Sequence, residues 1–170
     1  VPGTDDLGHP GAVSGVQYAP DGETLVSCGL DSTIKIWRIS DNTLLRTLRV
    51  PDEDETAPQG IVLSVTLSQD GETIISAGND NMVRVWNLAD GSLVRSLPVP
   101  GSDDMGHTAD VWGVAITRDG SKIVSGSADR TIKVWRASDG LLLRTISSPS
   151  DVYALAISPD GRVVVTGGKD

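Results

Sequence analysis

The sequence has few cysteines, few basic residues and no long apolar runs. Its single cysteine, Cys28, excludes an internal disulfide, so packing must stabilise the fold, and the lean is towards a reducing compartment such as the cytoplasm. Fourteen Lys and Arg stand against 23 Asp and Glu, which gives a formal net charge of −9. Nucleic acid and anionic membranes attract a basic field, so this balance argues against both as partners. No apolar run approaches the roughly 18 residues of a spanning helix.

A helical period is absent as well, and a different pattern recurs in its place. Residues 125–135 (SGSADRTIKVW) nearly repeat residues 76–86 (SAGNDNMVRVW) and 27–37 (SCGLDSTIKIW), at intervals of 49 residues. A period of roughly 20 to 50 residues marks a repeat architecture. Each copy holds a tight turn centred on Asp, followed by alternating apolar and polar residues that end on Trp. Such alternation is typical of a strand with two different faces.

Each repeat unit predicts four short strands joined by tight turns. The first strand ends in a turn such as Pro-Asp-Gly at residues 20–22, where Pro sets φ and Gly permits a positive φ. The second strand leads into the Asp turn and the third ends on Trp. The fourth reads Leu-Leu-Arg-Thr-Leu at residues 44–48, with close variants later. A meander of this kind cannot bury both of its faces alone, so the units must stack on one another.

These motifs resemble the WD-repeat β-propeller family. The resemblance is carried by Gly-His at 8–9 and 106–107, by Ser-Pro-Asp-Gly at 158–161, and by the recurring Ser, turn Asp and Trp. It covers essentially all 170 residues in register. It implies an all-β propeller of four-stranded antiparallel blades around a channel, built for protein contact. We expect three complete blades and the first half of a fourth within a ring of about seven: blade one about 9–49, blade two about 58–98, blade three about 107–146, and the half blade about 148–170.

The resemblance also implies a buried network in each blade, linking a loop His, the second-strand Ser, the turn Asp and the Trp. In blade two the His position holds Pro58. Because the set recurs once per blade, we interpret it as structural and not as a catalytic triad, which an enzyme needs once. The network residues are His9, Ser27, Asp31 and Trp37 in blade one; Ser76, Asp80 and Trp86 in blade two; and His107, Ser125, Asp129 and Trp135 in blade three.

Candidates for partner binding lie at the start of each first strand and before each turn Asp, positions that the resemblance places near the partner-binding face. Trp112 stands outside the Trp repeat, and Tyr153 has the matching position in the next blade. Aromatic anchors are over-represented in binding hot spots. The alternative is that Trp112 packs over the blade core. The candidates are Leu30, Leu63, Asp110, Trp112, Tyr153 and Lys169.

Acidic loops form a second group of candidates. Clustered carboxylates can bind calcium, which takes about six to eight oxygen ligands, but no helix-loop-helix calcium motif is present. We therefore expect solvated loops that face a basic partner, with no metal and no cofactor. These loops hold Asp5 and Asp6, residues 52–55 (Asp-Glu-Asp-Glu), and Asp103 and Asp104.

We predict a non-catalytic scaffold that presents a rigid propeller face to a protein or peptide. Two alternatives stay open: a regulatory or sensing propeller attached to a catalytic domain outside this segment, and a structural subunit that assembles through open blade edges. The sequence starts at Val1 and stops within the fourth copy of the motif. We therefore expect a segment of a longer propeller, whose remainder is supplied by the parent chain or by other subunits.

Overall fold

The computed structural model describes residues 8–51, 60–101 and 103–169, which form fourteen β-strands and no helix. Their order confirms the predicted all-β class. The strands are β1 (Val13–Tyr18), β2 (Thr24–Gly29), β3 (Thr33–Arg38), β4 (Thr43–Arg49), β5 (Val62–Leu67), β6 (Thr73–Gly78), β7 (Val83–Asn87), β8 (Leu93–Leu97), β9 (Val111–Ile116), β10 (Lys122–Ser127), β11 (Thr131–Arg136), β12 (Leu142–Ser147), β13 (Asp151–Ile157) and β14 (Val164–Lys169).

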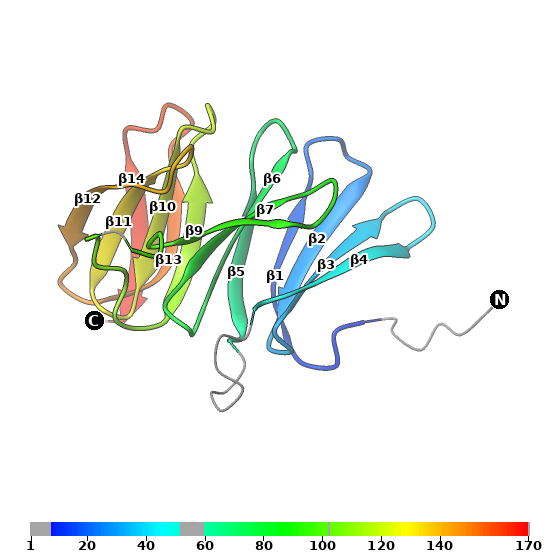
Figure 1. The fold of residues 1–170 in the computed structure, drawn as a ribbon, viewed down its shortest axis with the longest axis horizontal. Coiled ribbons are helices and arrows are strands. Elements are labelled where there is room, and N and C mark those ends of the chain that lie inside the picture. The colour runs from blue at the N-terminus through cyan, green and yellow to red at the C-terminus, as the bar shows by residue number, and fades with distance from the viewer. Residues whose placement is uncertain (1–7, 52–59, 102, 170) are drawn as a thin grey trace.

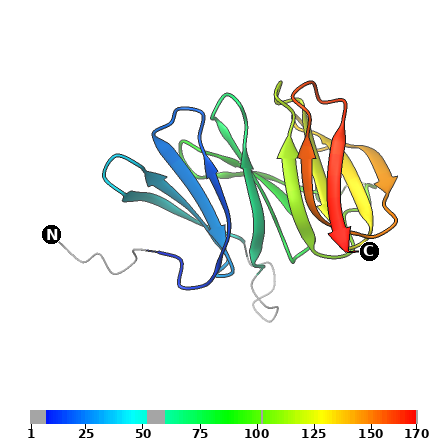
Figure 2. The same ribbon diagram turned by 180° about the vertical axis from the view of Figure 1, so that it is seen from behind.

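The strands form three four-stranded sheets and one two-stranded sheet. The orders are β1-β2-β3-β4, β5-β6-β7-β8, β9-β10-β11-β12 and β13-β14, and each pair of consecutive strands is antiparallel. The sheets stand side by side as an arc of blades (Figures 1 and 2). The first strands of successive blades, β1, β5, β9 and β13, contact one another along the inside of this arc. The fold is therefore a propeller array whose inner wall consists of first strands.

The apolar cores lie between the blades. Val26 and Cys28 of β2 pack in one cluster with Trp86 and Ile74 of the second blade. In the same way, Ile75 of the second blade packs in one cluster with Trp135 of the third. Each blade therefore has a trailing face, turned to the next blade, and a leading face that carries its Trp. Stacking of this kind is what a two-faced meander requires.

Each Asp turn contains a non-glycine residue at positive φ. The φ angles of Ser32, Asn81 and Arg130 are 63°, 65° and 63°. In each turn the Asp carboxylate accepts a hydrogen bond from the backbone N–H two residues on, for example from Thr131 to Asp129 Oδ1 at 2.8 Å. This bond offsets the cost of the left-handed conformation. The turn Asp therefore has a fixed position at one end of every complete blade.

Candidate functional site

A β-bulge interrupts the first strand of every blade near its start. In β1 the register passes from the pair Val13 and Gly29 to the pair Gly15 and Cys28, so Ser14 has no partner in the ladder. The same shift skips one residue in each of β5, β9 and β13. A bulge re-aims the side chain that it leaves unpaired. The four bulged residues, which occupy equivalent positions in their blades, are Ser14, Leu63, Trp112 and Tyr153.

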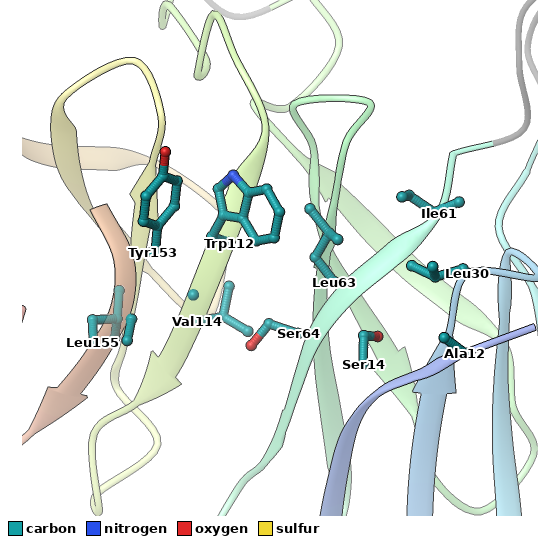
Figure 3. Close-up of a pocket in the computed structure, with 12 residues that line it drawn as sticks. Ala12, Ser14, Leu30, Ile61, Leu63, Ser64, Trp112, Val114, Tyr153 and Leu155 are labelled. Carbon is teal, nitrogen blue, oxygen red and sulfur yellow. The ribbon is translucent and has the colours of Figure 1, made fainter. Parts of the chain in front are cut away.

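The bulged residues line a groove of about 700 Å³ over the first strands (Figure 3). This volume lies in the range of roughly 300 to 1,000 Å³ that is typical of ligand pockets. The rings of Trp112 and Tyr153 meet edge to face, with centroids 5.3 Å apart and an interplanar angle of 79°. They remain 37% and 39% exposed. The other described lining residues are Ala12, Leu30, Ile61, Ser64, Gly113, Val114, Ala154 and Leu155, and none of them is charged.

Four of the six candidates for partner binding line this groove. They are Leu30, Leu63, Trp112 and Tyr153. Trp112 belongs to none of the clusters of buried apolar residues between the blades. The other two candidates lie outside the groove lining. Asp110 directly precedes β9, where its carbonyl accepts a hydrogen bond from the Ala128 N–H, and Lys169 is the exposed last residue of β14.

A buried network joins all four predicted residues in blade three. His107 Nδ1 lies 2.8 Å from Asp129 Oδ2, and His107 Nε2 lies 2.8 Å from Ser125 Oγ. Trp135 Nε1 donates to the same Ser125 Oγ at 2.9 Å. Burial lowers the pKa of His107 below its ordinary value of 6.5. The neutral ring therefore donates from Nδ1 to the carboxylate and accepts the Ser125 hydroxyl proton at Nε2.

Blade one repeats this network. His9 Nδ1 lies 3.0 Å from Asp31, His9 Nε2 lies 2.8 Å from Ser27 Oγ, and Trp37 Nε1 donates to Ser27 Oγ at 2.9 Å. Burial alone would raise the pKa of Asp31, but hydrogen bonds from His9 and Thr33 hold it below its ordinary value. Trp37 is only half-buried, because it stands on the leading face of blade one, where no other described sheet covers it.

Blade two has a different partner for its turn Asp. Trp86 Nε1 donates to Ser76 Oγ at 2.9 Å, as in the other blades. Asp80 pairs with Arg84 Nη1 at 2.6 Å, and the Arg84 side chain is buried. The position of Pro58 lies outside the described residues. Sequence reasoning missed Arg84, although it was the one Arg in a column that otherwise holds Lys35 and Lys133. A guanidinium can bind a carboxylate through a planar fork of donors, whereas the ammonium of Lys is a compact point charge.

The acidic loops are only partly described. Asp5, Asp6 and residues 52–55 lie outside the described residues, while the Asp104 carboxylate accepts a hydrogen bond from the Leu142 N–H at 3.2 Å. Across the described ranges, no group of three His, Cys, Asp or Glu side chains is placed to hold a metal ion. The described part of the chain also contains no helix long and apolar enough to cross a membrane.

Comparison with known proteins identifies the repeat. Residues 4–38, 43–87, 91–136 and 140–170 match the family model described as WD domain, G-beta repeat. The chain belongs to the WD40 repeat family. Each of the two central matches begins in the fourth strand or the preceding turn of one blade and ends at the third strand of the next. The WD40 sequence repeat is therefore displaced by about one strand from the structural blade.

Two curated relatives align with this chain over about the length of one repeat. An uncharacterised WD repeat-containing protein of Synechocystis sp. is 51% identical over 43 residues, which is 25% of this chain and 12% of the relative. The WD40 repeat-containing protein HOS15 of Arabidopsis thaliana is 48% identical over 42 residues, which is 25% of this chain and 7% of the relative. The aligned part is thus a small share of both relatives.

Solved WD40 structures share the fold over nearly the whole chain. The structure of U3-55K superposes with a TM-score of 0.79 at 22% identity, over 95% of this chain and 47% of that one. The crystal structure of the RRP9 WD40 repeats gives 0.78 at 22%, over 95% and 46%. The chain therefore spans about half the length of these propellers. WD40 propellers generally act as scaffolds for protein-protein interaction and are generally non-catalytic.

Proposed function

We propose that this WD40 segment is a non-catalytic scaffold that binds a protein or peptide in the groove of bulged residues. The observation that carries the proposal is the set of four equivalent β-bulges, which turn one side chain per blade toward a single uncharged groove. Bulges are enriched where a strand must re-aim a side chain for function. Exposed aromatic residues such as Trp112 and Tyr153 are typical anchors of binding hot spots.

The test is selection of a random peptide library on the immobilised protein, followed by titration of the selected peptides against variants. Trp112→Ala should weaken binding by about tenfold or more, as expected for a hot-spot aromatic. Leu143→Ala is the matched control, because this exposed apolar residue lies on the outer strand β12, outside the groove lining. Peptides that bind the wild type and Trp112→Ala equally well would refute the groove as the binding site.

We further propose that another sheet of the propeller, from the parent chain or from other subunits, covers the leading face of blade one. Val16 and Tyr18 on this face are 55% and 64% exposed. Their equivalents in blade two, Val65 and Leu67, are 8% and 9% exposed because they pack against blade one. The same positions are therefore apolar in both blades, but only blade two has its partner sheet among the described residues.

Sedimentation of the 170-residue chain tests the version in which copies of this chain supply that sheet. If they do, the chain should associate with rising concentration, and Tyr18→Arg should shift it toward the monomer, because a charge on a buried sheet face opposes packing. A strictly monomeric chain at every concentration would refute supply by copies of this chain.

A further inference from the structure

We infer that the groove takes an uncharged apolar side chain of its partner, and not a lysine or arginine. This inference rests on the proposed function and adds the chemical class of the ligand. It departs from the general expectation that a chain of net charge −9 attracts a basic partner. The distinction matters because the net charge of the whole chain does not determine the polarity of the described groove lining.

The described lining of the groove offers a cation no carboxylate. None of the described residues that line it is charged. Four Asp residues at this end of the blades already have partners: Asp31 with His9, Asp80 with Arg84, Asp129 with His107, and Asp151 with Arg130 at 3.2 Å. A lysine or arginine that entered the groove would lose water without meeting an opposite charge in the described lining, which is unfavourable.

The two charged candidates beside the groove do not change this balance. Asp110 and Lys169 have opposite charges, and neither is among the described residues that line the groove. Charge complementarity therefore favours an uncharged occupant. The acidic surplus includes Asp103 and Asp104, which are not among the described residues that line the groove and remain able to meet a basic surface of a partner.

The shape of the groove also favours an apolar side chain. The wall over β9 and β13 is filled by Trp112 and Tyr153, whereas the equivalent position on β1 holds only Ser14 (Figure 3). The Ser14 hydroxyl donates to the Val62 carbonyl of the next blade, so it does not offer that proton to a ligand. Leu63 lies between the two regions. The free space over Ser14 is thus bounded by apolar groups, and burial of apolar surface is the main interaction that it offers.

The experiment is an NMR titration of the complete ¹⁵N-labelled chain with four probes: the N-acetyl amides of tryptophan, leucine, lysine and arginine. The Trp112 indole N–H is the reporter, because the other three indole N–H groups are bonded to serine hydroxyls inside the blades. We expect saturable shifts of the Trp112 indole and the Ser64 and Gly113 amides with the two apolar probes. The lysine and arginine probes should bind at least tenfold more weakly.

A variant with an added negative charge gives a second readout. Ser64→Asp adds a carboxylate to the groove wall, so it should weaken the leucine probe and strengthen the lysine probe by several-fold, because the cation then finds a partner. Tyr18→Ser is the matched control, since it removes apolar surface from the leading face of blade one and not from the groove. The shifts at Trp112 should survive in this control.

Three outcomes would overturn the inference. One is binding of the lysine or arginine probe at Trp112 as tight as that of the leucine probe. Another is the lack of any saturable shift at Trp112 with the apolar probes, and the third is apolar binding confined to Val16 and Tyr18. The peptides selected from the library show whether only the inference about an apolar side chain fails or whether the proposed function of the groove fails as well. Peptides that need Trp112 but anchor through Lys or Arg would overturn only the inference, whereas peptides indifferent to Trp112 would overturn the groove itself.

Discussion

Replacement of Ser125 by alanine tests the buried network most directly. The Ser125 side chain is fully buried, and its Oγ joins Trp135 Nε1 at 2.9 Å to His107 Nε2 at 2.8 Å. Alanine has nearly the same size but no hydroxyl. It therefore leaves one buried N–H donor and one buried nitrogen acceptor without partners. Each buried group left unsatisfied costs about 1 to 3 kcal/mol.

The magnitude follows from comparison with blade two. Ser76 Oγ accepts the same bond from Trp86 at 2.9 Å, but the described residues around it include no histidine. Ser76→Ala should thus lose one hydrogen bond and cost about 1 to 2 kcal/mol, while Ser125→Ala should lose two and cost about 2 to 4 kcal/mol.

Urea unfolding monitored by circular dichroism measures both losses of unfolding free energy. Each appears as a lower midpoint urea concentration, while the dependence of the free energy on urea concentration stays the same. A Ser125→Ala cost no larger than that of Ser76→Ala would show that His107 Nε2 does not depend on the serine hydroxyl. That result would refute the assignment of the neutral tautomer with its proton on Nδ1. Costs below about 0.5 kcal/mol for both variants would refute the wider view that these bonds stabilise the blades.

Three further predictions concern single residues of the blades. Burial lowers the pKa of His107 below 6.5, so histidine takes up a proton more readily in the unfolded chain than in the folded one. The free energy of unfolding should therefore fall as pH drops below about 6.5. In urea titrations across this range, His107→Gln should make the free energy of unfolding less dependent on pH. Gly140 has φ +82°, and an added Cβ would lie 2.6 Å from Leu97 Cδ2. Gly140→Ala should therefore lower the free energy of unfolding by about 1 to 3 kcal/mol. An unchanged midpoint in thermal unfolding would contradict this packing. Arg84→Met leaves the partly exposed Asp80 unpaired and should cost about 1 to 3 kcal/mol, most of which Asp80→Asn should restore in the double variant.

Much of the blade architecture could be predicted from the sequence because its signals are local. A turn Asp, an alternating strand and a terminal Trp each depend on residues close together in the chain, and their 49-residue recurrence places them in register. The strands lie where this pattern indicates. The contacts of His107 with Ser125 and Asp129 agree with what the family resemblance implied, which the local pattern alone did not indicate. The partner of Asp80 could not be predicted in this way, because it depends on how far the Arg84 side chain reaches in three dimensions.

The four β-bulges could not be predicted from the sequence, because no shared residue type marks their positions. Ser14, Leu63, Trp112 and Tyr153 share no size, polarity or backbone preference, yet each is the residue that the ladder skips. Their equivalence was visible from the repeat alone, but their direction depends on pairing with the second strand. The groove is even harder to predict from the sequence, because its walls come from first strands and turns of four different blades.

The loop that enters the first strand of blade three joins the buried network to the groove. In blade three this loop begins at His107, which is bound to Asp129, and the next residue, Thr108, donates its N–H to the same carboxylate at 3.0 Å. The loop ends at Asp110, whose carbonyl accepts from Ala128 at 3.0 Å, two residues before Trp112. The network thus fixes both the turn and the loop beside it. Residues that have no contact with a partner therefore hold the anchor of the groove in place, because a rigid support limits the ordering that binding must otherwise impose on that side chain.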